Sequence, residues 1–327
     1  GHGNVACLGQ ALEENKDKLP TYRGHHEQNM ALTGVAYSRA KRRKQIFIAT
    51  SSVGPGSTNL LTAAAVAMSN RIPILFLPGD TYANRMPDPV LQQVEHFNNP
   101  GITANDAFKS VTRYFDRITR PEQILQSLPQ AIQLMIDPAD AGPACLSLCQ
   151  DTQGETFDYP EEFFKERVHN IRRPKPDDFE IKKAAEKIKS CKNPIIISGG
   201  GVFYSDAMEE LGNFAIKHNI PVTQTVMGYS TMKRDHSHFL GPIGGLGGKA
   251  ANNFAKKTDL AIAVGTKLAD FTTGSWANFE NPDFGLVSLN ITRHDANKHL
   301  AQAVVGDAKV SLIELSNALG SWKANDD

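Results

Sequence analysis

Short apolar runs rich in Ile, Val, Leu and Phe alternate along the chain with segments in which apolar residues recur at helical spacing. This alternation is typical of strands and helices arranged in parallel βαβ units. In the first half it predicts strands at 45–52, 72–79 and 143–150, with helices at 27–40, 57–69 and 121–136. In the second half it predicts strands at 193–200, 221–226, 259–266 and 285–292, and a last helix at 308–320.

Between these halves the texture of the chain changes. Residues 151–178 carry charged residues and prolines and show little strand or helix periodicity. Such a composition is typical of a linker between domains. We therefore predict an α/β fold of two doubly wound parallel-sheet domains, at residues 1–157 and 179–322, joined by a linker at 158–178.

The start of the chain, GHGNVACLGQALEEN, reads as a glycine loop that opens a helix. Such a loop normally follows a strand. The first domain is therefore expected to lack its first strand.

The overall charge argues against one class of partner. Among 327 residues, Lys and Arg number 35 and Asp and Glu also number 35, so the formal net charge is zero. Nucleic-acid binding depends on an excess of basic charge, so a nucleic acid is not an expected partner. The basic run KRRK at 41–44 ends a predicted helix, where cations suit the helix dipole.

Hydropathy and cysteine usage indicate a protein of a reducing compartment. No apolar run approaches the roughly 18–20 residues that span a bilayer, and we expect no membrane association. Cys145 and Cys149 share a predicted strand but would lie about 13 Å apart, too far for a disulfide. Cys7 and Cys191 show no metal-ligand spacing with the others. We expect small buried cysteines, a cytoplasmic location and no metal ligands in this chain.

Three glycine-rich segments have two interpretations each. GHGNVA fits the dinucleotide fingerprint G-x-G-x-x-A, which requires an acid about 20 residues further on, at the end of a strand. Glu27 has that spacing but begins a helix, so an NAD-dependent dehydrogenase is only an alternative. SGGG at 198–201 and GPIGGLGGKA at 241–250 could cradle phosphate through backbone N–H groups, or simply form tight turns.

The segment TSSVGPGSTN at 50–59 is more specific. A strand ends, the turn of Gly54, Pro55 and Gly56 follows, and Ser57 or Thr58 could cap the next helix. Glycines let a ligand approach the backbone at the carboxyl edge of a parallel sheet, where ligands of α/β proteins usually bind.

Glu27 lies in YRGHHEQNMAL, where a loop leads into an apolar helix. A carboxylate in the first turn of a helix is favoured by the dipole, which is the structural interpretation. The alternative is a catalytic proton partner at the mouth of the helix. The residue alone does not decide between the two.

Taken together, these motifs resemble the thiamine diphosphate enzymes of the acetolactate synthase type. The segment RGHHEQNMALTGVAYSRA is similar to the one that carries that family's activating glutamate, and TSSVGPGSTN and NRIPILFLPGD are similar to its next two segments. NPIIISGGGV, GPIGGLGG and AVGTKLADFTTG resemble its central domain. The resemblance implies a pyrimidine-binding domain followed by a central domain.

The family's third domain binds the diphosphate through Mg²⁺, with a GDG motif followed by a pair of asparagines. Here GDT at 79–81 and GDA at 306–308 lack such a pair. We therefore expect a fragment without the third domain, inactive by itself, with the Mg²⁺ and diphosphate ligands outside it.

Within the family, GHGNVACLGQALEE, PDPVLQQVEH and DAFKSVTRYFDRI resemble the ring-opening hydrolases of inositol catabolism. That likeness implies hydrolysis of a C–C bond in a trihydroxycyclohexane-1,2-dione, giving 5-deoxy-glucuronate. A carboligase or decarboxylase of the acetolactate synthase kind and a non-catalytic nucleotide-binding module are the alternatives. The resemblance also implies a homodimer or homotetramer. FAD, which occupies the central domain of some relatives, is not expected here.

The resemblance assigns roles to individual residues. Glu27 would hydrogen-bond the aminopyrimidine ring of thiamine diphosphate, and Gly54, Pro55 and Gly56 would form the loop under it. Candidates for substrate binding or proton relay are His2, Asn4, His25, His26, Gln92 and Gln93. Burial would raise the pKa of Glu27 and the helix N-terminus would lower it, and we expect burial to prevail if the site is dry.

Overall fold

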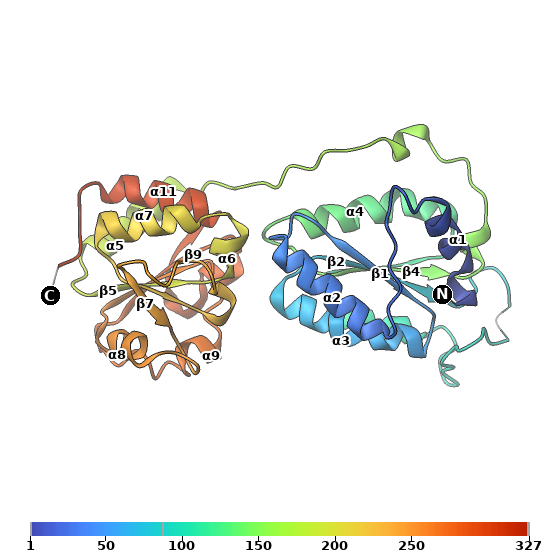
Figure 1. Cartoon of the computed structure of the whole chain (residues 1–327), viewed down its shortest axis with the longest axis horizontal. Helices are drawn as coiled ribbons and strands as arrows, with labels where there is room; N and C mark the ends of the chain where they lie inside the picture. Colours follow the sequence, from blue (N-terminus) through green and yellow to red (C-terminus); the bar gives the residue numbers. More distant parts are fainter. Residues whose placement is uncertain (1, 87, 326–327) are drawn as a thin grey trace. The chain divides into compact units, whose positions relative to one another are not determined.

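The computed structural model describes residues 2–86 and 88–325, which divide into two compact units on either side of the Ile171–Arg172 bond. Unit 1 comprises the described residues up to Ile171, and unit 2 those from Arg172 onward. Both are parallel sheets covered by helices (Figure 1), which confirms the predicted α/β fold. The division falls within the segment that the sequence assigns to a linker.

The sheet of unit 1 has the strand order β1-β2-β4-β3, and all its pairings are parallel. Its strands are β1 (Phe47–Ser51), β2 (Ile74–Asp80), β3 (Tyr114–Ile118) and β4 (Ala144–Cys149). Its helices are α1 (Ala6–Glu14), α2 (Glu27–Ala40), α3 (Pro55–Asn70) and α4 (Ile124–Ile136). Short 3₁₀ helices include Gly3–Val5, Ala104–Ser110 and Pro121–Gln123.

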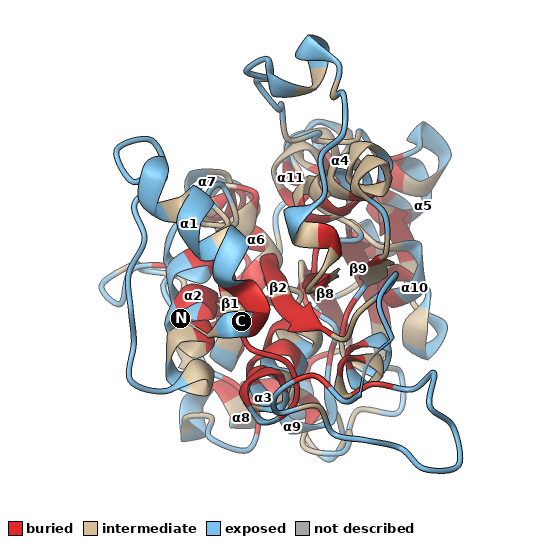
Figure 2. Cartoon of the chain, turned by 90° about the vertical axis from the view of Figure 1, so that its right-hand side faces the viewer, coloured by how far each residue is buried: buried red, intermediate tan, exposed pale blue. Residues whose placement is uncertain are grey.

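Helices cover both faces of this sheet. In Figure 1, α2 and α3 lie on one face and α4 on the other. Leu75 of β2 packs in a cluster with Ala131 and Met135 of α4, whereas Phe76 packs against Phe108 with ring centroids 5.5 Å apart. Successive residues of β2 thus face opposite layers, as a strand's two-residue period requires. In Figure 2, β2 is buried while α1 is largely exposed.

Unit 2 has a parallel sheet in the order β10-β9-β8-β5-β6-β7. Its strands are β5 (Pro194–Ser198), β6 (Val222–Gln224), β7 (Phe239–Pro242), β8 (Leu260–Val264), β9 (Gly285–Asn290) and β10 (Gln302–Val305). Its helices are α5 (Asp178–Lys189), α6 (Gly200–Tyr204), α7 (Met208–His218), α8 (Lys249–Lys257), α9 (Asp270–Thr273), α10 (Arg293–Ala296) and α11 (Ala308–Leu319).

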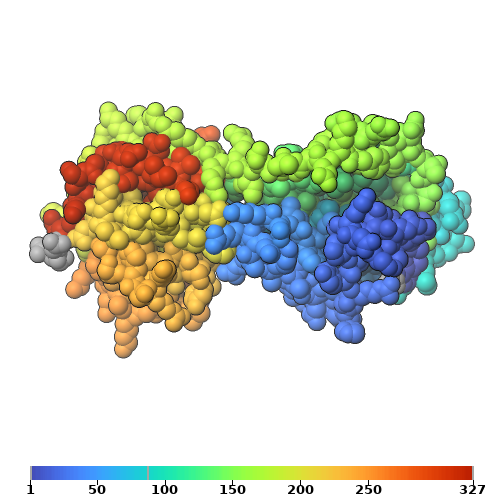
Figure 3. Space-filling view, turned by 45° about the horizontal axis from the view of Figure 1, so that its top comes forward, coloured from blue at the N-terminus to red at the C-terminus, as the bar shows by residue number. Residues whose placement is uncertain are grey.

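Two apolar clusters form the interior of unit 2. One joins the sheet to α5, α7 and α11, and includes Ile188, Leu211 and Leu315. The other, on the opposite face, includes Ile195 and Ala255. The yellow α7 and the red α11 lie side by side on the surface (Figure 3). Every residue of β5 and β8 is buried, which explains the unbroken apolar runs of these strands.

Two local expectations from the sequence are wrong. Neither Ser57 nor Thr58 caps α3, because the helix begins earlier, at Pro55, with Gly54 at the cap position. The proline ring presets the helical φ angle at the first position, where its missing N–H costs nothing. Cys7 is exposed rather than buried, whereas Cys145 and Cys149 are buried and unpaired as expected.

No helix within residues 2–86 and 88–325 is both long and apolar enough to cross a membrane.

Candidate active site

The carboxyl edge of the unit 1 sheet gathers most of the residues that the sequence singled out. Ser52, Thr81 and Gln150 directly follow β1, β2 and β4, so they mark this edge. Because α2 runs antiparallel to the strand that it precedes, and α3 to the strand that it follows, both helices begin at the same edge. The geometry therefore brings a helix mouth, a glycine turn and three strand ends into one region.

Glu27 is the first residue of α2 and follows His26, whose backbone is extended. Its side chain is half-buried, and its Oε2 accepts a hydrogen bond from Asn59 Nδ2 at 3.1 Å. Asn59 lies one turn into α3. The carboxylate is therefore held between the first turns of two helices, where it can meet a ligand and still be oriented by the protein.

The pKa of Glu27 lies below its usual value. The largest cause is the hydrogen bond between the carboxylate and its own backbone N–H, and the Asn59 amide and the charge of His26 lower the pKa further. Burial acts in the opposite direction but is outweighed. In the chain by itself the hydrogen bonds prevail, because the carboxylate is only half-buried. The prediction that burial prevails concerns a dry site and stays a prediction. Glu27 is ionised at neutral pH.

The Gly-Pro-Gly turn lies beside this carboxylate. Gly54 has a φ of +69°, and a Cβ at this position would come within 2.0 Å of the backbone oxygen of Gln92. At Gly56 a Cβ would lie 2.3 Å from Ser52 Oγ and 3.6 Å from Glu27 Oε1. Gly54 is therefore needed for the turn itself, and Gly56 lets Ser52 Oγ lie close to the backbone beside the carboxylate. Pro55, the first residue of α3, is exposed.

Gln92 and Gln93 join the same edge from the loop that follows β2. Gln92 Oε1 accepts a hydrogen bond from Ser52 Oγ at 3.3 Å, and its backbone has a φ of +67°. Gln93 Oε1 accepts hydrogen bonds from Thr81 Oγ1 at 3.0 Å and from the backbone N–H of Val90 at 3.1 Å. The structure thus places Gln92 against the Gly54 turn and Gln93 at the end of β2.

Asn4 lies on the β2–β4 side of the edge and is only 1% exposed. Its Nδ2 donates to Gln150 Oε1 at 2.7 Å, and its backbone oxygen accepts from Gln153 Nε2 at 2.8 Å. Its own backbone N–H donates to His2 Nδ1 at 3.3 Å. The buried Oδ1 of Asn4 has no hydrogen-bond partner in the described part of the chain.

His25 and His26 are both exposed in the loop before α2. Of the two, His26 affects Glu27, because its charge lowers the pKa of that carboxyl group. The structure therefore groups Glu27, the glycine turn and Gln92 closely, and places His2, Asn4 and Gln93 further along the same edge.

Sequence reasoning missed Ser52 and Asn59, which both contact this group. Ser52 follows a predicted strand directly, so its place at a strand end could have been inferred. Asn59 lies four residues after Pro55, on the turn that follows the helix start, so helical spacing also gave a signal for it.

Two further observations bear on cofactors. The dinucleotide fingerprint requires its acid at the end of a strand, but Glu27 begins α2, so its context is not met. No group of three or more His, Cys, Asp or Glu side chains that could hold a metal ion occurs in the part of the chain that the structure describes.

Comparison with protein families gives two matches, one in each unit. Residues 3–99 match the thiamine pyrophosphate enzyme N-terminal TPP binding domain, and residues 181–315 match the central domain of the same enzymes. The first match covers Glu27 and the glycine turn, and the second covers most of unit 2.

Curated relatives resemble almost the whole chain. It is 50% identical over 319 residues to the 3D-(3,5/4)-trihydroxycyclohexane-1,2-dione hydrolase of Clostridium tetani, and 49% identical over 319 residues to that of Clostridium perfringens. The protein of the same name from Listeria monocytogenes is 48% identical over 323 residues. These alignments cover 98–99% of this chain but 50% of each relative, so the chain spans about half the length of the curated relatives it matches.

Proposed function

Because this chain belongs to the thiamine pyrophosphate enzyme family and carries its N-terminal and central domains, we propose that unit 1 binds the pyrimidine ring of thiamine diphosphate. The whole protein would be a hydrolase that opens the ring of a trihydroxycyclohexane-1,2-dione at a C–C bond. The observation that carries the proposal is the half-buried Glu27 carboxylate, oriented by Asn59 and lying beside the Gly-Pro-Gly turn.

The residues at this edge fit the ring. Glu27 would hydrogen-bond a ring nitrogen through its carboxylate, while Asn59 keeps that carboxylate oriented. Gly54 and Gly56 would let the turn pass close under the ring, because neither carries a side chain. When bound, thiamine diphosphate supplies the electron sink that cleavage of a C–C bond next to a carbonyl requires.

Proton transfer falls to Glu27. The low pKa of its carboxyl group keeps it ionised at neutral pH in the chain by itself. Because a carboxylate and a ring nitrogen without hydrogen are both acceptors, the pair would share one proton that is taken up on binding. A ring seated against the carboxylate would remove water from it, so its pKa is expected to rise on binding. His2, Asn4, Gln92 and Gln93 are our candidates for the substrate side, since they lie along the same edge.

The name of these relatives supports the choice of substrate. Their identity of 48–50% is measured over nearly all of this chain. In the proposed reaction, water adds across a ring C–C bond next to a carbonyl and gives an open-chain acid, 5-deoxy-glucuronate. Product analysis separates this from a carboligase or decarboxylase, because only the hydrolase converts the dione to one acid without loss of carbon.

The test is Glu27→Gln in the whole protein, at the length of the relatives. We expect exchange of the C2 proton of thiamine diphosphate for deuterium, followed by NMR, to slow by at least ~100-fold, because the amide cannot share a proton with the ring. Glu13→Gln, at an exposed position of α1, is the control and should leave the exchange unchanged. Exchange at the normal rate in folded Glu27→Gln protein would remove Glu27 from the mechanism.

We also propose Mg²⁺ as the partner of the diphosphate, and assembly into a homodimer or homotetramer. Three exposed apolar side chains on the loop after β2 support the assembly: Met86 (89% exposed), Leu91 (71%) and Phe97 (90%). Apolar side chains gathered near a site often mark an interface. Sedimentation of the whole protein should give at least a dimer, and Leu91→Ser with Phe97→Ser should lower its mass. A monomer at micromolar concentration would contradict this proposal.

A further inference from the structure

The segment of residues 81–103, which follows β2, holds Gln92 and Gln93 without regular secondary structure of its own. Its described residues form no helix or strand, and most of its side chains between Ala83 and Gly101 are exposed. A segment of this kind is expected to move unless polar contacts fasten it. The contacts that fasten it therefore decide where Gln92 and Gln93 lie.

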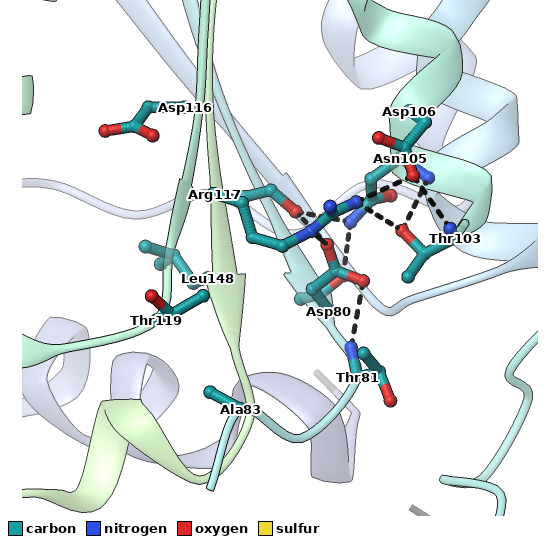
Figure 4. A network of polar contacts seen from close by, with 12 residues as sticks. Asp80, Thr81, Ala83, Thr103, Asn105, Asp106, Asp116, Arg117, Thr119 and Leu148 are labelled. Carbon is teal, nitrogen blue, oxygen red and sulfur yellow. Dashed lines mark hydrogen bonds and ion pairs between the residues drawn. The ribbon is translucent and has the colours of Figure 1, made fainter. Parts of the chain in front are cut away.

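One cation ties the two ends of the segment together. Arg117 of β3 donates through Nε to Asp80 Oδ2 at 2.8 Å, and through Nη2 to Thr103 Oγ1 and Asp106 Oδ2, each at 2.9 Å. Asp80 directly precedes the segment and Thr103 ends it. Figure 4 shows the Arg117 side chain extending from its strand to all three partners. We refer to Arg117, Asp80, Thr103 and Asp106 as the Arg117 clamp.

Two clamp residues, Asp80 and Thr103, are buried, Arg117 and Asp106 are partly buried, and the charges are balanced. Asp80 is fully buried, and it also accepts hydrogen bonds from Ser147 Oγ at 2.6 Å and from the backbone N–H of Thr81 at 2.9 Å. Lys109 pairs with Asp106 at 2.7 Å, so two cations face two carboxylates. The planar fork of an arginine can bond both carboxylates at once, which a lysine ammonium does less well.

Additional bonds fix the segment between its ends. The Asp151 carboxylate accepts the backbone N–H groups of Ala83, Asn84 and Arg85 at 2.8, 2.9 and 3.0 Å. Further on, Oε1 of Gln92 accepts a hydrogen bond from Ser52. The backbone oxygen of Gln92 lies close to Gly54. Gln92 is not a glycine yet has a φ of +67°, so its backbone is strained and the surrounding contacts must hold it there.

We propose that the Arg117 clamp is a positioning device for the substrate side of the site: by tying both ends of residues 81–103, it holds Gln92 and Gln93 at the edge where Glu27 lies. Arg117 acts through the segment and touches neither cofactor nor substrate. The consequence for catalysis rests on the proposed function, whereas the consequence for the segment does not.

The first test measures amide hydrogen exchange in this chain. In Arg117→Lys, peptides within 88–99 should exchange about tenfold faster, while peptides of α2 and β1 keep their rates, because only the segment opens. Arg120→Lys is the matched control, since Arg120 is exposed and lies three residues further on. If Arg117→Lys does not fold, Asp106→Asn decides, because it keeps the Asp80 pair. Unchanged exchange of 88–99 in the folded variant would overturn the proposal.

The second test uses the whole protein and separates positioning from a general loss of structure. In Arg117→Lys we expect kcat/KM for the dione to fall on the order of tenfold, because a displaced segment misplaces Gln92 and Gln93. Exchange of the cofactor C2 proton should be unchanged, because α2 and α3 hold Glu27 and Asn59. Equal losses in both would overturn the positioning role. If the wild-type protein does not turn over the dione, the proposed function fails, and the exchange measurement still decides the role of the clamp.

Discussion

The charge of Glu27 depends on the hydrogen bonds that its carboxylate accepts. Its backbone N–H and the Asn59 amide together hold the pKa down against the effect of burial. Asn59 lies 32 positions after Glu27 in the sequence, and it reaches the carboxylate only because α2 and α3 pack side by side. A helix N-terminus alone would favour the ionised form, but the second helix also sets the direction in which the carboxylate points.

At Gly54 we predict a large cost for a single methyl group. Gly54→Ala combines a φ of +69° with a Cβ 2.0 Å from the Gln92 oxygen, so the turn or the neighbouring loop must move. We expect the free energy of unfolding of unit 1, measured by urea titration, to fall by about 2 kcal/mol or more. Gly9→Ala is the control, because a Cβ there meets nothing within 4 Å and α1 should gain up to ~1 kcal/mol. Equal stability of Gly54→Ala and wild type would contradict the strain argument.

At the scale of secondary-structure elements, the three strands absent from the sequence prediction share one position. β3, β7 and β10 are edge strands of the two sheets. An edge strand is less completely buried than a central one, so its apolar pattern is weaker. β3 carries Asp116 and Arg117, and β7 contains Gly241 and Pro242. The central strands, by contrast, read as continuous apolar runs and were predicted, and so was β1, the edge strand opposite β3.

The 3₁₀ helix at Ala104–Ser110 depends on a capping box in which Thr103 and Asp106 bond each other's backbone. Burial raises the pKa of Asp106, but hydrogen bonds from Lys109, from the backbone of Thr103 and from Arg117 outweigh it and bring the pKa to about 2. Because this value lies below the usual 3.8, the ionised carboxylate stabilises the folded state. That stabilisation is complete above about pH 4 and is lost as the pH falls through about 2.

Asp106→Asn should therefore destabilise unit 1 in a pH-dependent way. We expect a loss of about 2 kcal/mol at pH 7, which shrinks as the pH falls from about 4 toward 2, because protonation removes the same charge from the wild type. Urea unfolding of both proteins across this range measures it. Asp140→Asn, at an exposed position of the same unit, is the control. A difference in stability that stayed constant down to pH 2 would show that the charge of Asp106 is not the cause.

At the scale of the whole molecule, each unit has an apolar interior of its own. The cluster that joins the unit 2 sheet to α5, α7 and α11 also receives Trp322, just beyond α11. The backbone oxygen of Trp322 bonds His218 Nδ1 at 2.8 Å, so the chain after α11 remains fastened to the unit. All the parts of a stable domain are thus present within residues 172–325.

We therefore predict that residues 172–327 fold when produced alone. Urea unfolding should be cooperative, with a free energy of roughly 5–15 kcal/mol. Tryptophan fluorescence reports this unit selectively, because both tryptophans of the chain, Trp276 and Trp322, lie in it. The same transition in the 327-residue chain is the reference. A non-cooperative transition, or a midpoint far below that of the chain, would show that unit 2 depends on unit 1.

The sequence by itself determined the α/β class, the central strands, and the edge at which Glu27 and the Gly-Pro-Gly turn would lie. These features follow from local patterns, because a buried strand and a helix start each leave a signal within about ten residues. Its resemblance to the thiamine diphosphate enzymes is matched by both family comparisons.

Only the tertiary structure decided which side chains meet at that edge. Asn59 reaches Glu27, Ser52 reaches Gln92, and Arg117 joins Asp80 to Asp106. Local patterns place Ser52 at a strand end and Asn59 one turn into a helix, but they do not show which partner each meets, because that depends on how separate elements pack together. The low pKa of Glu27 has the same origin: it depends on how deeply the carboxylate is buried and on which donors surround it, and both are properties of the folded chain.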